Sequence, residues 1–141
     1  MMRALITGHA EFAQGMKSAL ELIAGPQEEI RALPFDESTG LEAYHQAICD
    51  FCDEDEDEEA VIFTDMIGGT PFNQAMIAKE GRQRLHIITG TNLPMLMEFI
   101  AQGMIQESCP DCLEIPIETA KEGITLDLEL FLRLEEEGGG I

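Results

Sequence analysis

One histidine and one aspartate each come directly after a short apolar run. His9 follows Ala4–Gly8, and Asp65 follows Ala60–Thr64. Both runs are typical of buried strands, so each side chain lies near a strand's carboxyl end, where open α/β sheets bind ligands. A carboxylate that accepts a proton from one imidazole nitrogen fixes the tautomer and leaves the other nitrogen nucleophilic. The pair therefore predicts a histidine that can attack an electrophile.

A glycine-rich helix entrance follows the aspartate. Gly68 and Gly69 precede Thr70, and Pro71 occupies a position that favours the first turn of a helix. Backbone N–H groups of such a turn, with the Thr70 hydroxyl, can bind an anion. An anion site beside a nucleophilic His9 predicts a covalent phosphohistidine, with Asp65 as its orienting partner.

Strand and helix patterns alternate along most of the chain. This βαβαβαβα order predicts one α/β domain with an open parallel sheet covered by helices on both faces. Strand order 2-1-3-4 would place the first and third strands side by side and open a crevice at their carboxyl ends. The expected strands are Arg3–Thr7, Glu29–Pro34, Ala60–Thr64 and Leu85–Ile88, and the expected helices are Phe12 to a stop at Gly25, Gly40–Cys52, Pro71–Glu80 and Leu93–Gln102.

The last third of the chain is less regular. Glu118–Glu122 is typical of a short helix, and Ile124–Leu128 alternates like a strand. Residues 135–141 are expected to form a mobile tail. We expect residues 1–141 to make a single domain, because no linker or internal repeat divides them.

Charge limits the partners. The 141 residues carry 28 acidic and 8 basic side chains, a formal net charge of -20. This excludes charge-driven binding to nucleic acid or to an anionic membrane. The acidic run Asp53–Glu59 is expected to be a solvated loop, or alternatively a docking surface for a basic partner. No apolar run reaches the ~20 residues of a membrane span, and a signal-peptide core is missing, so we expect a cytoplasmic protein.

Several ordered motifs resemble one family, the enzyme IIA components of the mannose family in the bacterial sugar phosphotransferase system. The resemblance covers about Ala4 to Thr125. Its motifs are Thr7-Gly8-His9, Thr64-Asp65-x-x-Gly68-Gly69-Thr70-Pro71-Phe72-Asn73, Ile88-Thr89-Gly90-Thr91-Asn92-Leu93-Pro94-Met95-Leu96 and Ala120-Lys121-Glu122-Gly123-Ile124.

The resemblance implies a phosphotransferase without a cofactor. His9 would accept a phosphoryl group from the phosphocarrier HPr and pass it to the IIB component, while the membrane subunits IIC and IID import the sugar. Asp65 would orient His9, and Thr70 would contact the phosphate. The family also implies a homodimer that exchanges a carboxyl-terminal strand, here Ile124–Leu128. The sugar stays open: a mannose-family sugar, N-acetylgalactosamine or another hexose or amino sugar.

The sequence departs from the family pattern at two places. One is Ala10, where many relatives carry glycine, and the other is the unmatched segment Gln106–Pro116.

All 4 cysteines fall into two C-x-x-C pairs, Cys49/Cys52 and Cys109/Cys112. Reduced thiols without a role are the first interpretation. A structural zinc site is a second, because two such pairs can complete a tetrahedral set. A redox role is a third, because Cys109-Pro110-Asp111-Cys112 has a thioredoxin-like spacing.

Two other functions fit the fold class. A flavodoxin-like electron carrier matches the length and acidity, but the chain has 0 Trp and 1 Tyr to stack on a flavin. A regulatory module could use His9 as a phosphorylation switch without passing the group on. His45 and His86 lack a neighbouring carboxylate and glycine turn in sequence, so we expect both to be structural.

Overall fold

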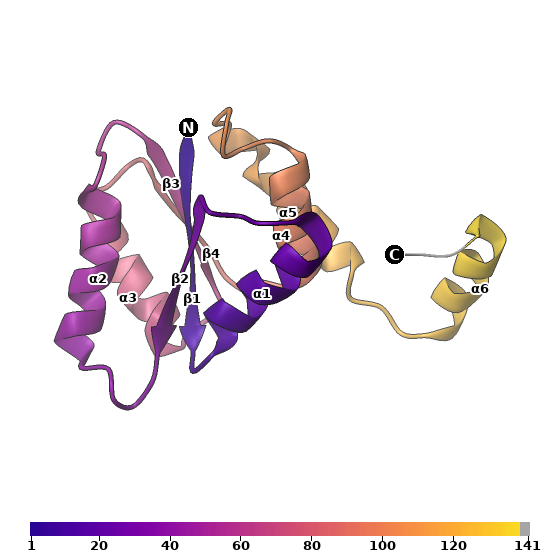
Figure 1. Cartoon of the computed structure of the whole chain (residues 1–141), viewed down its shortest axis with the longest axis horizontal. Helices are drawn as coiled ribbons and strands as arrows, with labels where there is room; N and C mark the ends of the chain where they lie inside the picture. Colours follow the sequence, from indigo (N-terminus) through magenta and orange to yellow (C-terminus); the bar gives the residue numbers. More distant parts are fainter. Residues whose placement is uncertain (139–141) are drawn as a thin grey trace.

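The computed structural model describes residues 1–138 as a four-stranded sheet between two layers of helices (Figure 1). The elements in chain order are β1 (Met2–His9), α1 (Phe12–Ala24), β2 (Ile30–Phe35), α2 (Leu41–Asp53), β3 (Glu59–Thr64), α3 (Thr70–Lys79), β4 (Leu85–Ile88), α4 (Leu93–Ala101), the 3-10 helix η1 (Pro110–Leu113), α5 (Glu114–Glu122) and α6 (Leu128–Glu137).

All strands run parallel in the order β2-β1-β3-β4, which confirms the predicted fold class and strand order. β1 and β3 lie at the centre and are apolar almost throughout, as strands covered on both faces must be. Their carboxyl ends lie at the lower edge of the sheet in Figure 1, where the arrowheads point.

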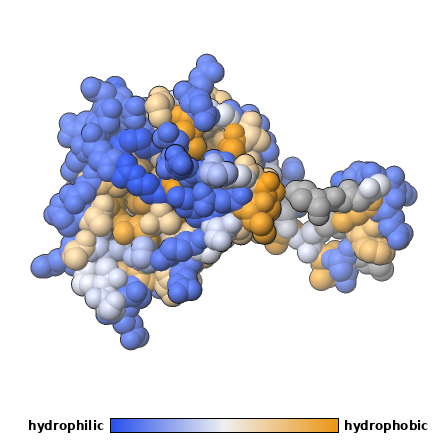
Figure 2. All heavy atoms as spheres, viewed as in Figure 1, coloured by the Kyte–Doolittle hydropathy of each residue, from blue (hydrophilic) through white to orange (hydrophobic). Residues whose placement is uncertain are grey.

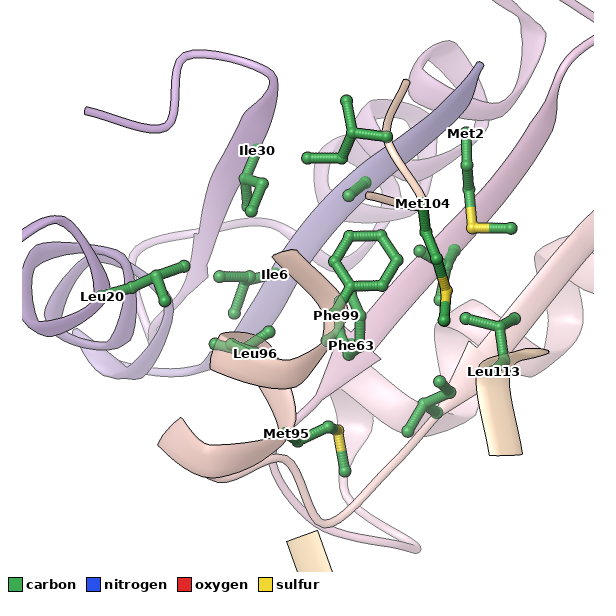
Figure 3. Packing of buried hydrophobic residues seen from close by; sticks show 14 of the residues in the cluster. Met2, Ile6, Leu20, Ile30, Phe63, Met95, Leu96, Phe99, Met104 and Leu113 are labelled. Atoms are coloured by element: carbon green, nitrogen blue, oxygen red, sulfur yellow. The ribbon is translucent and has the colours of Figure 1, made fainter. Parts of the chain in front are cut away.

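Successive side chains of the strands feed two separate cores, because they point to opposite faces of the sheet. One core joins the sheet to α1, α4 and α5, and Phe63 meets Phe99 edge-on there with ring centroids 5.1 Å apart (Figure 3). The other core joins the sheet to α2 and α3 through Leu5, Ile62 and Tyr44. The sheet therefore separates the two sets of buried side chains.

Two element boundaries differ by more than one residue from the sequence-based expectation. β1 continues to His9 instead of ending at Thr7, because β2 pairs alongside it as far as the His9–Phe35 partners. α5 begins at Glu114 rather than Glu118, directly after η1. His9 is consequently the last residue of a paired strand, which holds its backbone in place.

The strand expected at Ile124–Leu128 is not formed in this chain. Residues 124–126 have no regular structure, and α6 begins at Leu128. A lone segment has no neighbouring strand to satisfy its backbone groups, whereas apolar residues at 128, 131 and 132 have helical spacing. Figure 1 shows α6 away from the sheet and its covering helices.

The expected mobile tail falls partly in α6, which includes residues 135–137. Residues 139–141 lie outside the part of the chain that the structure describes. Within residues 1–138, no helix is both long and apolar enough to cross a membrane.

The acidic run between α2 and β3 is a solvated loop, as expected, and arginines anchor its backbone. Residues 53–57 are exposed, and Figure 2 shows hydrophilic residues gathered over this part of the surface. Arg3 donates to the carbonyl oxygens of Cys52 and Asp55, each at 3.1 Å, and Arg84 donates to that of Asp57. Arg82 pairs with the Asp53 carboxylate at 2.9 Å. These contacts lie at the amino edge of the sheet, opposite His9.

Candidate active site

His9 and Asp65 meet at the carboxyl edge of the sheet, as the strand order predicts. Thr7 and Thr64 are register partners in β1 and β3, so the chain brings the residues that follow them together. Asp65 Oδ2 accepts the His9 backbone N–H at 2.9 Å and lies 2.6 Å from His9 Nδ1. The His9 side chain is 46% exposed and that of Asp65 13% exposed. The histidine is therefore open to a partner while its carboxylate is shielded.

The Asp65 carboxylate is held in its charged form. Its burial would raise the pKa, but hydrogen bonds from the His9 backbone, the His9 ring and the Met66 N–H together hold the pKa below its usual value. A charged Oδ2 beside Nδ1 requires that nitrogen to donate. Nε2, the other ring nitrogen, then carries the lone pair.

Gly8 permits this close approach. A Cβ at position 8 would lie 2.6 Å from Phe12 Cδ1 and 3.0 Å from Asp65 Cγ, closer than carbon atoms can pack. Any larger residue would force Asp65 away from β1. Steric exclusion therefore explains why the Thr7-Gly8-His9 motif has glycine at its centre.

The glycine turn lies against the nucleophilic side of the ring. A Cβ on Gly69 would be 2.7 Å from His9 Cε1 and 3.4 Å from Nε2. Gly68 has a φ of 82°, and its carbonyl accepts the Asn73 side-chain amide at 3.2 Å. Asn73 was not among the predicted site residues, although it stands in the same sequence motif. It holds the turn in its shape.

Thr70 is the first residue of α3, so its N–H belongs to the helix end that lacks an internal acceptor. Within residues 1–138 its hydroxyl makes no hydrogen bond either. His9, Asp65, Gly68, Gly69 and Thr70 are thus brought to one edge, as predicted. Side by side they offer a lone pair and free donors, which suit a tetrahedral anion.

An aromatic support beneath the ring was missed by sequence reasoning. Phe35 meets the His9 ring edge-on at 6.3 Å and contacts the Tyr44 ring at 4.7 Å. The buried Tyr44 hydroxyl lies 2.6 Å from Thr7 Oγ1, and burial of the phenol raises the Tyr44 pKa to about 12. Only the register of β1 on β2, which periodicity does not reveal, could have placed Phe35 beside His9.

Ala10 adopts the left-handed backbone region directly after the histidine. Its φ is 50°, and its N–H donates to the Phe35 carbonyl at 2.6 Å. A side chain in this region costs about 1 kcal/mol relative to glycine. The hydrogen bond fixes the chain as it leaves the strand.

The Gly90–Leu93 motif supports the site without joining it. Thr91 Oγ1 donates to the Thr64 carbonyl at 2.8 Å, next to Asp65. Asn92 caps α4 by accepting the Met95 N–H at 3.1 Å and donates to the Ala120 carbonyl at 3.0 Å. These bonds tie the ends of β3, α4 and α5 together.

The cysteine pairs do not form a zinc site. Cys109 and Cys112 form a disulfide, and Cys49 and Cys52 are free. Cys52 belongs to the core beside α2, whereas Cys112 packs against the core on the other face of the sheet. The sheet therefore keeps the pairs apart, and residues 1–138 contain no group of three possible ligand side chains arranged around a metal position.

The other two histidines do not join the His9–Asp65 pair. His86 Nε2 lies 2.6 Å from Glu59 Oε2, a carboxylate partner that the sequence did not reveal. The pair joins the start of β3 to β4 and has no glycine turn. His45 Nε2 lies 3.4 Å from Cys49 Sγ within α2. A structural role for both histidines stays a prediction.

The fold and site define an open parallel α/β domain with a histidine–aspartate pair at its carboxyl edge. A family model, EIIA-man, described as the PTS system fructose IIA component, matches residues 3–115. The chain belongs to this family of phosphotransferase-system IIA components. It is a phosphotransferase of the sugar phosphotransferase system, which removes the electron-carrier alternative.

Individual relatives agree with the family. The chain is 33% identical over 105 residues to the fructose-specific EIIA component of Bacillus subtilis (strain 168), covering 72% of this chain and 70% of that protein. It is 28% identical over 97 residues to the sorbose-specific EIIA component of Lacticaseibacillus casei, covering 69% and 70%. The crystal structure of a phosphotransferase-system EIIA component from Streptococcus agalactiae superposes with a TM-score of 0.81 at 30% identity, covering 89% of this chain and 97% of that one.

Proposed function

We propose that His9 is the phosphoryl carrier of this IIA component, which accepts the group from HPr and delivers it to a IIB component. The observation that carries the proposal is the hydrogen bond between Nδ1 and Asp65, which leaves Nε2 free and facing the turn at Gly69. The family assignment supports the same direction of transfer.

The transfer forms one bond and breaks one. The Nε2 lone pair attacks phosphorus while the bond between phosphorus and the donor's imidazole nitrogen breaks, and the donor ring leaves with that electron pair. His9 keeps its proton on Nδ1 and becomes cationic, and the charged Asp65 stabilises this cation from the far side of the ring. Positioning and charge supply most of the catalysis in such a transfer.

The phosphoryl oxygens are bound by the turn in this proposal. The N–H groups of Gly68 and Gly69 and the Thr70 hydroxyl donate to them, and the Thr70 N–H at the start of α3 adds a further donor. Delivery to IIB is the reverse reaction with a different acceptor. A ring that is 46% exposed gives both partner proteins access to the same nitrogen.

The partners imply a cytoplasmic location, and the membrane subunits IIC and IID act only after IIB. The related proteins named above are specific for different sugars, fructose and sorbose. We therefore propose that this soluble component does not select the sugar.

A homodimer remains part of the proposal, with the free edge of β4 as the place where a segment such as Ile124–Leu128 of a second copy would pair.

The test is phosphorylation of the full chain with phosphoenolpyruvate, enzyme I and HPr. Intact mass should show one acid-labile phosphoryl group on the wild type and on His45→Ala, and none on His9→Ala. Adding a IIB component should then discharge the labelled protein. Labelling of His9→Ala would reject the assignment. Labelling without any discharge by IIB components of the family would favour the regulatory module instead.

A further inference from the structure

The second C-x-x-C pair lies apart from the phosphoryl-transfer site and has a chemistry of its own. Cys109 and Cys112 are joined in a disulfide with Cα atoms 5.2 Å apart. They bracket the start of η1 at the amino edge of the sheet, whereas His9 lies at the carboxyl edge. Nothing in phosphoryl transfer uses them.

The turn that carries the disulfide is closed by the backbone as well. The Cys112 N–H donates to the Cys109 carbonyl at 2.9 Å, and Pro110 fixes one of the intervening φ angles. Leu113 and Pro116 are buried directly after it and anchor the segment to the core. Because these contacts do not involve sulfur, the two cysteines remain close together when the bond between them is broken.

Both sulfur-bearing residues are half-buried, so a small thiol can reach them. The other pair differs. Cys52 is buried, which raises its pKa to about 11, and a protonated thiol is a poor nucleophile. Cys49 lies against His45 within α2. The chain thus contains one disulfide between two half-buried cysteines and a second pair in which Cys52 is buried.

We propose that Cys109 and Cys112 form a reversible dithiol–disulfide site whose reactants are low-molecular-weight thiols and their disulfides, of the glutathione class. In reduction, a thiolate attacks one sulfur to give a mixed disulfide, and a second thiolate displaces the protein sulfur. Two thiols are oxidised to one small disulfide, and the protein gains two thiol groups. Oxidation reverses these steps.

A cytoplasmic location, which rests on the proposed function, favours a reversible disulfide over a permanent one. Disulfides in that compartment are seldom permanent and usually serve catalysis or redox sensing. The disulfide begins the segment that continues into α5, and the Ala120 carbonyl near the end of α5 is bonded to Asn92. The disulfide is therefore linked through α5 to the carboxyl edge of the sheet.

The experiment equilibrates the full-length protein in glutathione buffers of graded reduced-to-oxidised ratio. Samples are quenched in acid, unfolded and alkylated with N-ethylmaleimide. The number of alkylated thiols is then counted from the intact mass. The wild type should change from two alkylated thiols to four in one two-electron transition as the ratio rises. Cys49→Ser, the matched control, should change from one to three over the same ratios.

Cys109→Ser and Cys112→Ser should each lose this transition and form a single glutathione adduct instead. The thermal midpoint of the wild type should fall by ~2–6 °C on reduction, the size expected for opening a short loop. Two alkylated thiols at every ratio would show a permanent disulfide and overturn the proposal. Four at every ratio, or a transition that survives in Cys109→Ser, would overturn it too. None of these readouts depends on phosphorylation of His9.

Discussion

At position 69 the main chain approaches the His9 ring so closely that even a methyl group does not fit. Gly69 has φ -76° and ψ 165°, a conformation that alanine adopts without strain. Gly69→Ala should therefore fold normally, yet its Cβ would displace the ring from its place 2.7 Å away. We expect phosphorylation by HPr to slow at least ~10-fold with little change in thermal midpoint.

Gly15→Ala is the matched control for this substitution. Gly15 lies inside α1, and a methyl group added there would meet nothing within 4 Å, so alanine should stabilise the helix by ~0.5–1 kcal/mol. Its phosphorylation rate should equal that of the wild type. Equal rates for both variants would show that the turn does not position the ring.

Asp65 should make the stability of the protein depend on acid. Its pKa is lowered in the folded state, so its stabilising contribution is complete above the ordinary value of 3.8 and disappears as pH falls through the folded value. Asp65→Asn should be less stable than the wild type near neutral pH, and the two should converge as pH falls through the lowered pKa of the folded Asp65 carboxyl. Denaturant unfolding at several pH values measures this.

The same variant should slow phosphorylation at least ~10-fold, because an amide cannot stabilise a cationic ring. A gap in stability that persists unchanged at the lowest pH would contradict the role of the charged carboxylate.

Among the elements, α4 and α5 depend on one amide side chain. Asn92→Ala removes the cap of α4 and the bond to the Ala120 carbonyl together. We expect a loss of ~1–2 kcal/mol in the free energy of unfolding. Gln102→Ala, which removes an exposed amide at the other end of α4, should change it by less than ~0.5 kcal/mol. Similar losses in both would mean that Asn92 acts only as a surface residue.

Apolar periodicity was enough to predict the four strands and the helices between them, because buried parallel strands read as short apolar runs. Strand order then placed His9 beside Asp65. Periodicity could not show that β1 continues to His9 or that Phe35 lies beneath the ring, because both depend on cross-strand register. It also suggested a strand at Ile124–Leu128, where alternation and helical spacing overlap.

The disulfide and the partner of His86 could not be predicted from the sequence for a related reason. Cys109 and Cys112 form a disulfide only because a turn closes between them, and Glu59 meets His86 only because β3 and β4 pair. Contacts of this kind depend on three-dimensional placement rather than on residue type. The glycine turn was predictable because its residues adjoin each other in the chain.

For the molecule as a whole, a net charge of -20 should act on stability and on association in opposite directions. Repulsion among the acidic side chains destabilises the folded state, so salt that screens it should raise stability. The same salt also screens attraction to a donor with a positive face, so it should weaken association. Raising NaCl from ~50 to ~500 mM should raise the thermal midpoint and slow phosphorylation at limiting HPr several-fold. A rate insensitive to salt would mean that the donor is recognised without charge.

In the proposed function, the exposure of His9 also sets how long a captured phosphoryl group lasts. No lid covers the ring in the described residues, so water reaches Nε2 by the same route as a partner protein. Each loaded molecule then faces competition between delivery and spontaneous hydrolysis. In this proposal the phosphohistidine is short-lived. Such a carrier suits continuous transfer from donor to acceptor, and it does not suit long storage of the phosphoryl group.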